Sequence, residues 1–341
     1  MSGSPKKRLS NMSSVIGYHL NQSPFYRLSS KRKLAKILGF DFADFASLVD
    51  DSNYREFTNK QGRLIQHPIG ILAPIHQRIA ELLARLELPS YLHSRKGCSY
   101  ISNAAAHAEN VSLIKTDISK FYPSTSFSAI VKMFRCDFEC SRDVAWHIAR
   151  LCSFKGKYLP TGSHLSGIVA FLSHKAMFNE IYTFSIKHGC TMTCYVDDIV
   201  ISGPKATKTL LNEIHNIIRG HGLVAKPEKS KTFPANKPKI VTGVVITADG
   251  LAVPNKLLHK IHQNQELILT TSNSPKRRQL FQSLRGQKQA AKQILDFGNK
   301  TQAIIDSHST KRANNASQVA GCQHERLFTT PTPPTSHPLL P

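Results

Sequence analysis

The chain has 341 residues, which is enough to bury a sizeable core and to form two or three subdomains. It carries 45 Lys and Arg residues against 22 Asp and Glu residues, a formal net charge of +23 at pH 7. This excess of positive charge favours a polyanionic partner, most simply nucleic acid. Seven cysteines without small-domain or zinc-like spacing argue against a disulfide framework and against a zinc site.

No apolar run approaches the roughly 18 residues that a membrane span needs. The first 14 residues are polar and basic, and they lack the apolar stretch of a signal peptide. We therefore expect a cytoplasmic protein with no membrane partner.

Residues 1–53 are expected to form a basic, partly helical N-terminal extension. A hairpin is predicted over residues 54–68, with Asn59-Lys60-Gln61-Gly62 as its turn. A helix is predicted over residues 74–88, with Pro74 in its first turn. Its apolar stripe consists of Ile75, Ile79, Leu82, Leu83 and Leu86.

Three further helices are predicted, over residues 141–152, 165–188 and 205–219. Strands are predicted near residues 111–117, 191–202 and 240–247. Because helices lie between these strands, we expect a mixed sheet covered by helices on one face. A basic helical segment over residues 251–305 follows, and a Thr-, Pro-, Ser- and Asn-rich tail over residues 306–341 is expected to be disordered.

The sequence Tyr195-Val196-Asp197-Asp198 lies at the centre of a strand–turn–strand pattern. Two adjacent carboxylates at such a turn repel each other, and a divalent cation such as Mg²⁺ removes that cost. Asp117 ends the apolar strand of residues 111–117. Strand-end carboxylates that meet in one sheet form the ligand set of a two-metal phosphoryl-transfer site. The alternatives are an ordinary turn for the Asp pair and a helix N-cap for Asp117.

Further sequence blocks surround these carboxylates. Asp117 begins the block DISKFYPS, which ends at Ser124, and Leu159-Pro160-Thr161-Gly162-Ser163 follows. The order of these blocks resembles the palm of a reverse transcriptase. The block SYISNAAAH over residues 99–107 and Val241-Thr242-Gly243 are similar to signatures of the bacterial retron type. The resemblance spans residues 54–298.

The resemblance implies an α+β right-hand polymerase. Fingers and a mixed-sheet palm would occupy residues 54–250, and a short helical thumb would occupy residues 251–305. The implied function is RNA-directed DNA synthesis on a structured non-coding RNA by two-metal nucleotidyl transfer, in retron-type anti-phage defence. It implies dNTPs, a DNA product and two Mg²⁺ ions, and it leaves open an effector or toxin protein as a further partner.

The resemblance also assigns roles to individual residues. Asp117, Asp197 and Asp198 would be catalytic and, with the Ile118 carbonyl, would bind metal. Tyr122 would exclude the ribose 2′-hydroxyl, with a core aromatic as the alternative. The remaining substrate contacts would be Lys60 and Arg63 on the triphosphate, Thr161 and Gly162 at the nascent pair, and Lys229 at the pyrophosphate, with Lys226 or Lys231 as alternatives. Arg285, Lys288 and Lys292 recur on one helical face and would follow the nucleic-acid backbone.

The sequence departs from the retron pattern at several positions. Thr161 stands where Gln is usual, His164 and Gly167 replace residues that are commonly Pro, and Cys194 and Val196 replace Arg and Ala. These differences leave nucleotide selection open. The alternatives are a defence-associated reverse transcriptase outside the retrons that makes repetitive or template-light DNA, a catalytically decayed RNA-binding module, and a nucleic-acid chaperone. The intact carboxylates oppose the decayed module.

Overall fold

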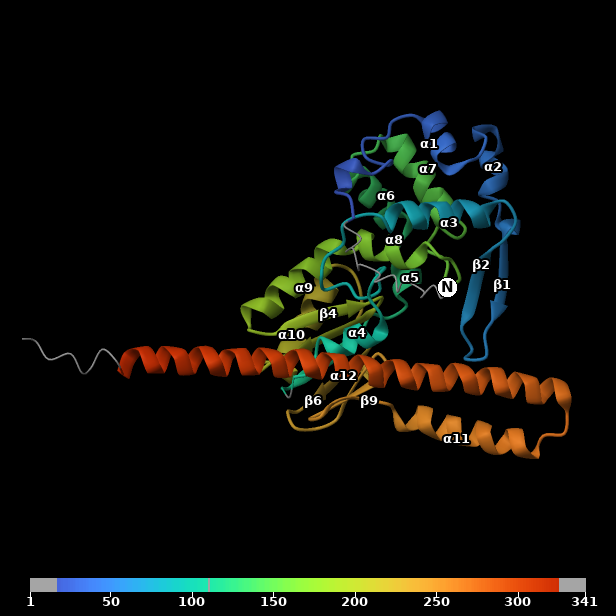
Figure 1. Cartoon of the computed structure of the whole chain (residues 1–341). Coiled ribbons are helices and arrows are strands. Elements are labelled where there is room, and N and C mark those ends of the chain that lie inside the picture. The colour runs from blue at the N-terminus through green and yellow to red at the C-terminus, as the bar shows by residue number, and fades with distance from the viewer. Residues whose placement is uncertain (1–16, 110, 325–341) are drawn as a thin grey trace, which may run out of the picture. The chain divides into compact units, whose positions relative to one another are not determined.

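The computed structural model describes residues 17–109 and 111–324, with side chains up to residue 299 (Figure 1). The chain divides into two compact units, Met1–Asp249 and Gly250–Pro341, here called the N-terminal and C-terminal units. The division lies one residue from the predicted start of the helical segment at residue 251. None of the described helices is long and apolar enough to cross a membrane.

The main sheet of the N-terminal unit has the strand order β4-β5-β3-β6. Its strands are β3 (Leu113–Asp117), β4 (Thr191–Tyr195), β5 (Asp198–Ser202) and β6 (Lys231–Phe233). Each neighbouring pair is antiparallel, so the prediction of a mixed sheet was wrong. The reason is that β5 lies between β3 and β4 and separates the two strands that run in the same direction. The prediction of an α+β fold is confirmed.

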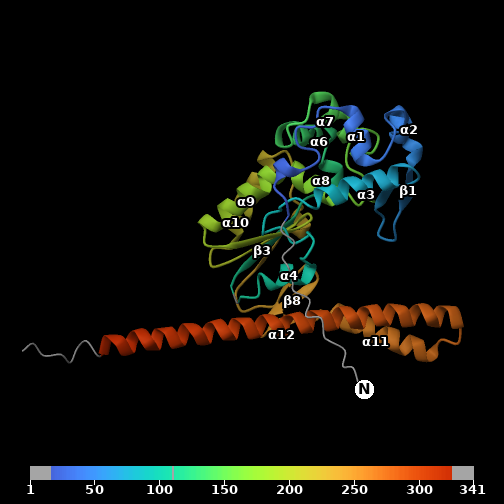
Figure 2. The same cartoon turned by 45° about the horizontal axis from the view of Figure 1, so that its top comes forward.

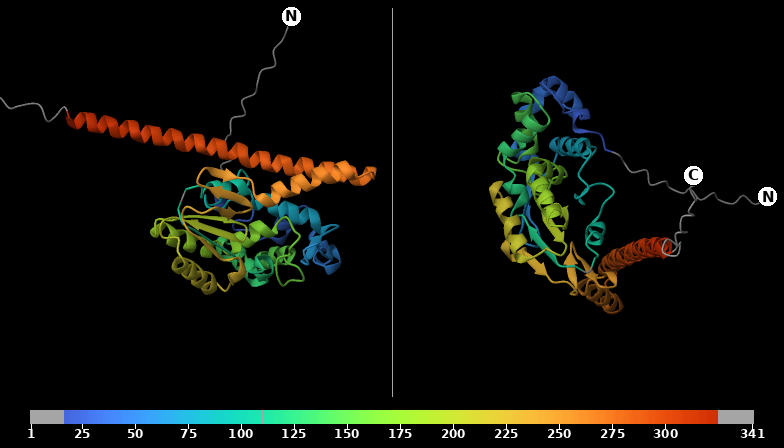
Figure 3. Two further views of the ribbon diagram at one scale, coloured as in Figure 1. Left: turned by 90° about the horizontal axis from the view of Figure 1, so that it is seen from below. Right: turned by 90° about the vertical axis from the view of Figure 1, so that its left-hand side faces the viewer.

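The two faces of the main sheet differ in character. Alternation along β3, β4 and β5 places Ile114, Met192, Ile199 and Ile201 on one face, where they belong to the hydrophobic core. Helices α9 (Lys175–Lys187) and α10 (Lys208–Gly220) lie along this sheet (Figures 2 and 3). The opposite face carries Asp117 and its neighbours. The core therefore fixes one side of the sheet, and Asp117 and Asp198 lie on the other side.

The segment of residues 240–247 forms a separate hairpin instead of one strand. Strands β7 (Lys239–Val241) and β8 (Val244–Thr247) pair antiparallel. Thr242 and Gly243 form the turn with φ of 44° and 84°, the left-handed conformation that tight hairpins require. The predicted strand over residues 240–247 is thus interrupted at Thr242 and Gly243, and Val241-Thr242-Gly243 is by itself typical of a strand that runs into a turn.

Most predicted helices of the N-terminal unit are present. The predicted helix over 141–152 is confirmed, and all five residues of the predicted apolar stripe are buried. The predicted helix over 165–188 is instead two helices that meet at His174, whose ring packs against Phe121 and pairs with the Thr125 hydroxyl at 3.2 Å. The further helices are α3 (Leu72–Leu83), α4 (Tyr100–Ala105), α5 (Phe121–Ser124), α6 (Phe127–Lys132), the π-helix η4 (Met133–Asp137), α7 (Arg142–Cys152), α8 (Ser166–Ser173) and the 3₁₀ turn η5 (Pro227–Lys229).

The described part of the N-terminal extension belongs to the N-terminal unit. Phe25, Leu34 and Leu48 are buried in its core. The extension contains η1 (Leu20–Gln22), α1 (Lys31–Leu38), η2 (Phe42–Asp44), α2 (Phe45–Leu48) and η3 (Asp51–Asn53). The predicted hairpin follows and is confirmed as β1 (Tyr54–Thr58) paired with β2 (Leu64–Pro68). Residues 1–16 lie outside the described residues.

The C-terminal unit consists of β9 (Gly250–Ala252), α11 (Asn255–Thr270) and α12 (Ser274–His324). The Asn273 side chain caps α12 by accepting from the Lys276 amide at 3.0 Å. With 51 residues, α12 is too long for the predicted short thumb. Residues 306–324 are helical rather than disordered, and the prolines of the predicted tail all lie beyond residue 330. Residues 325–341 lie outside the described residues.

Candidate active site

Three predicted carboxylates lie at adjacent strand ends of the main sheet. Asp117 ends β3 and stands opposite Asp198, the first residue of β5. The Ile118 amide donates to the Asp197 carbonyl at 3.1 Å, which joins the end of β3 to the turn between β4 and β5. Asp117 is only 3% exposed. The pairing register, rather than flexible loops, therefore brings the three residues together.

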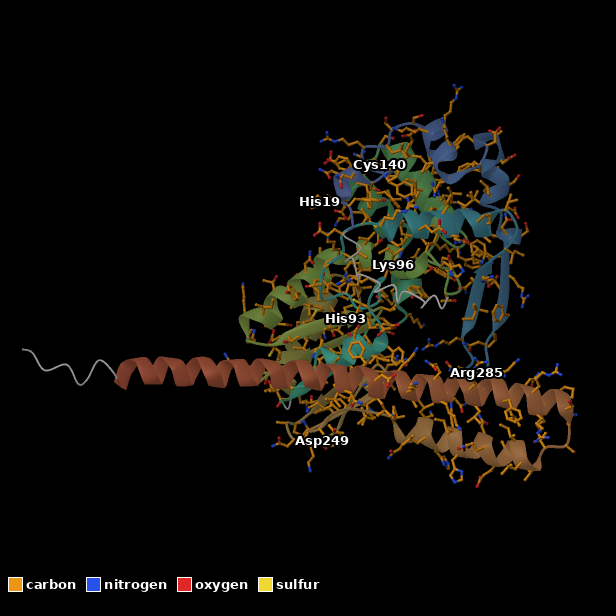
Figure 4. All side chains as sticks on the ribbon, in the orientation of Figure 1. His19, His93, Lys96, Cys140, Asp249 and Arg285 are labelled. Carbon is orange, nitrogen blue, oxygen red and sulfur yellow. The ribbon has the colours of Figure 1, made fainter. Side chains whose placement is uncertain are left out.

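The aspartate turn, Tyr195–Asp198, is strained. Val196 has a φ of 59°, a left-handed conformation that β-branched residues rarely adopt. Its amide donates to the Ser94 hydroxyl at 3.2 Å. The amide of His93, labelled in Figure 4, donates to the Cys194 carbonyl at 2.8 Å. The segment before α4 thus holds the turn in place, a role that no local pattern in the sequence indicated.

The carboxylates repel one another. Burial raises the pKa of Asp197 to about 6, with further contributions from Asp117 and Asp198. Burial and the charge of Asp117 also raise the pKa of Asp198. The Lys229 ammonium pairs with the Asp117 carboxylate. Burial lowers the pKa of Lys229, but its hydrogen bond with Asp117 and the charges of the three carboxylates outweigh that effect and raise it.

The donor chemistry of this site fits a hard divalent cation. Carboxylate oxygens are preferred Mg²⁺ ligands, and a cation would relieve the repulsion among the three aspartates. Among the described residues, however, no three His, Cys, Asp or Glu side chains already converge as a metal site. Lys229 pairs with the Asp117 carboxylate, so a cation bound there would compete with this ion pair.

A cavity of about 730 Å³ lies in front of the aspartates. Its volume is within the range of about 300–1,000 Å³ found for small-molecule sites. Eight residues singled out in the sequence line it: Arg63, Asp117, Ile118, Tyr122, Thr161, Asp197, Asp198 and Lys226. Lys60 is exposed in the hairpin turn, and neither it nor Gly162 lines the cavity.

The two adjacent aromatics at the cavity have different environments. Phe121 is buried against His174 and Phe178. Tyr122 is half-buried and lines the cavity, and burial together with the charge of Asp197 raises its pKa to about 12. Both residues belong to the short helix α5 rather than to a strand, so helical geometry and not strand alternation directs them apart.

Thr161, which departs from the family pattern, bonds to β2. Its amide and hydroxyl donate to the Gln66 side-chain oxygen at 3.1 and 2.9 Å. The hydroxyl also lies 2.9 Å from the Leu64 carbonyl. Gln66 is only 3% exposed, and its carboxamide lines the cavity beside Thr161. The loop of residues 159–163 is thereby fixed to the β1–β2 hairpin.

Gly162 allows the loop of residues 159–163 to approach β2 closely. Its amide donates to the Gln66 carbonyl at 3.0 Å. A Cβ at this position would lie 2.7 Å from Ile65 Cγ2 and 2.8 Å from the Gln66 carbonyl oxygen. The close approach in the structure is thus to the strand, whereas the sequence suggested an approach to the nascent base pair.

We expect Gly162→Ala to destabilise the fold by about 1–3 kcal/mol, because the added methyl overpacks a backbone contact. Urea unfolding of both proteins measures the difference. The control is Gly220→Ala, since a Cβ at Gly220 meets no atom within 4 Å. Equal midpoints for Gly162→Ala and the unsubstituted protein would show that the loop relaxes without cost.

Of the three candidate lysines, Lys229 is the one that contacts an aspartate side chain. The Lys226 amide donates to the Asp117 carbonyl at 2.7 Å, and its side chain lines the cavity. Lys231 is exposed on β6 and stands opposite Lys115. Arg285, Lys288 and Lys292 are exposed on α12 in the C-terminal unit.

The two blocks with retron-like sequences pack together. The Thr242 hydroxyl donates to the Tyr100 carbonyl at 2.7 Å. His107, which is fully buried, pairs with the Ser202 and Thr193 hydroxyls at 2.7 and 2.8 Å, and burial lowers its pKa to about 3. The neutral imidazole joins the block of residues 99–107 to β4 and β5, the strands that carry the aspartate turn.

The protein was compared with known families and relatives. The reverse transcriptase (RNA-dependent DNA polymerase) family profile matches residues 51–246, more than half of the chain. Retron Se72 reverse transcriptase of Salmonella heidelberg is 27% identical over 194 residues, which cover 52% of this chain and 50% of that protein. Retron Ec48 reverse transcriptase of Escherichia coli is 20% identical over 274 residues, which cover 72% of this chain and 67% of that protein.

The chain thus spans 50% and 67% of the lengths of these two relatives. Among solved structures, telomerase from Candida albicans in complex with a fragment of telomeric RNA is 12% identical, with a TM-score of 0.42. That match covers 63% of this chain and 50% of the telomerase chain. From the family match, the order of its motifs and its retron relatives, we conclude that this chain belongs to the reverse transcriptase (RNA-dependent DNA polymerase) family and is of the retron type.

Proposed function

We propose that this protein is an RNA-directed DNA polymerase that adds dNTPs to a primer 3′-hydroxyl. The observation that carries the proposal is the grouping of Asp117, Asp197 and Asp198 at one wall of the 730 Å³ cavity, which Arg63, Tyr122 and Thr161 also line. Family membership supports the same activity. Primer extension with purified protein, an RNA template, dNTPs and Mg²⁺ tests it.

In this mechanism the residues of the chain bind the metal ions and the triphosphate, orient the reacting groups and neutralise charge. The three aspartates and the Ile118 carbonyl would hold two Mg²⁺ ions, which supply activation of the 3′-hydroxyl and neutralisation of the triphosphate. Arg63 can bind a phosphate bidentately from the edge of the cavity, with Lys60 as a second cation on the same hairpin. Lys229 would leave Asp117 and donate a proton to the departing pyrophosphate.

We propose a structured non-coding RNA as the template and anti-phage defence as the role. The retron relatives and the net charge of +23 support an RNA partner. Sequencing the nucleic acid that co-purifies with the protein is the decisive experiment. A single structured RNA joined to complementary DNA supports the proposal, repetitive DNA without a matching RNA supports the non-retron alternative, and RNA without any DNA supports a decayed binding module.

The C-terminal unit is proposed to bind the template–primer duplex through its phosphates. Arg285, Lys288 and Lys292 are exposed at intervals of three and four residues on α12, so they lie on one helical face. Neutralising all three should make the negative slope of log affinity against log salt less steep by about three units, because each lost phosphate contact removes about one unit. Duplex-binding titrations at several salt concentrations measure this slope.

The control for this triple variant neutralises Lys187, Lys205 and Lys208, which are exposed in the N-terminal unit. Both variants lose the same charge, so a general field effect would change both slopes equally. A slope that is unchanged in the α12 variant, or changed equally in both, would mean that this helical face does not contact the duplex.

A further inference from the structure

Three polar groups within hydrogen-bonding distance of one another form a triangle on the core side of the main sheet. The Thr116 hydroxyl lies 2.8 Å from the Ser230 hydroxyl. Nε2 of His215 lies 3.1 Å from each of these two oxygens. The three residues come from β3, from the residue that follows η5, and from α10. None of them lines the cavity in front of the aspartates.

Each hydroxyl of the triangle is next in sequence to a residue of the candidate site. Thr116 precedes Asp117, and Ser230 follows Lys229. The Ser230 amide also donates to the Lys226 carbonyl at 3.1 Å, and the Ser230 hydroxyl lies 3.0 Å from the same oxygen. Because the Lys226 amide in turn donates to the Asp117 carbonyl at 2.7 Å, the turn that carries Lys229 is tied to the end of β3.

His215 is suited to anchor this arrangement. It lies on α10, whose residues Leu210, Ile214 and Ile218 are buried in the hydrophobic core. Burial lowers the pKa of His215, and the charge of Arg219 lowers it further, which favours the neutral ring. A neutral imidazole pairs with hydroxyl groups without adding a charge near the aspartates.

Lys229 needs such support because its own side chain is flexible. The Lys229 side chain is 41% exposed, and the side chain of its partner Asp117 is 5% exposed. Ordering a lysine side chain costs rotamer entropy, and a displaced backbone would add to that cost. A misplacement of about 1 Å far from the chemistry can slow an enzyme by about 100-fold.

We infer that His215 is a positioning residue that acts through Ser230 and Thr116 to hold the turn that carries Lys229 beside the end of β3. The inference rests on the proposed polymerase function. It gives His215 a role in the rate of nucleotide addition without any contact with substrate. The alternative is that the triangle only stabilises the fold.

The test uses the full chain in primer extension with saturating RNA template. His215→Leu removes the ring nitrogen and should lower kcat by about 10- to 100-fold, while the KM for dNTP changes less than about three-fold. His215→Gln places an amide near the position of Nε2 and should restore most of the rate. The matched control is His221→Leu at the end of the same helix, where the ring pairs with Glu180 instead of the main sheet, and its kcat should not change.

A double variant separates positioning from general stability. If His215 acts through Lys229, His215→Leu should slow Lys229→Ala no further, because the group it positions is already absent. Additive losses, an unchanged kcat in His215→Leu, or no rescue by Gln would each overturn the inference. If His215→Leu does not fold, Ser230→Ala, which removes one hydroxyl, replaces it in the test. This variant should also lower kcat with little change in KM, and it should slow Lys229→Ala no further. Absence of activity in the unsubstituted protein would instead refute the proposed function.

Discussion

Asp197→Asn should reduce nucleotide addition by about 1,000-fold or more, because a metal ligand contributes several kcal/mol to the transition state. The fold should remain, since the substitution preserves side-chain shape and no apolar packing changes. It also removes one of three mutually repelling carboxylates, whose repulsion is evident in the pKa of Asp197, raised to about 6 by burial and by Asp117 and Asp198. Thermal stability should therefore be unchanged or slightly higher.

Primer extension on an RNA template with Mg²⁺ measures this loss, and RNA binding by the same variant should stay close to that of the unsubstituted protein. The control is Asp249→Asn, which changes the charge equally at an exposed position of the N-terminal unit, labelled in Figure 4. Activity near normal in Asp197→Asn would refute the two-metal assignment. A loss of RNA binding together with activity would point to a folding defect.

Tyr122→Ala should admit ribonucleotides into the cavity. The half-buried ring lines the cavity beside the aspartate turn, where it would meet the 2′-hydroxyl of an incoming nucleotide. Removing the ring should lower the preference for dNTP over rNTP by about 10- to 100-fold, the discrimination that steric exclusion of a small group provides. Incorporation of matched dNTP and rNTP by both proteins measures the ratio of kcat/KM.

The control for Tyr122 is Phe127→Ala, which removes another half-buried ring, one that packs against Trp146 outside the cavity. General loosening of the fold would impair both variants without changing either ratio. A ratio that stays constant in Tyr122→Ala would make Tyr122 a packing residue and would place the sugar selectivity elsewhere in the cavity.

The sequence by itself determined the features that depend on short-range patterns. The strand–turn–strand pattern around Asp197 and Asp198 predicted the hairpin, because a two-residue turn is a local event. The apolar stripe from Ile75 to Leu86 predicted its own burial. The order of the motifs identified the family before any geometry was known. Each hairpin, helix or motif is defined by residues that are close in the chain.

Tertiary structure alone decided which distant residues meet. The position of β5 between β3 and β4 made the main sheet antiparallel, and the predicted helix over residues 165–188 is divided at His174. The pairing of Lys229 with Asp117, the bonds from Thr161 to Gln66 and the triangle around His215 join residues far apart in sequence. Such contacts depend on strand register and helix packing, which arise from the core as a whole, so no local pattern could have predicted them.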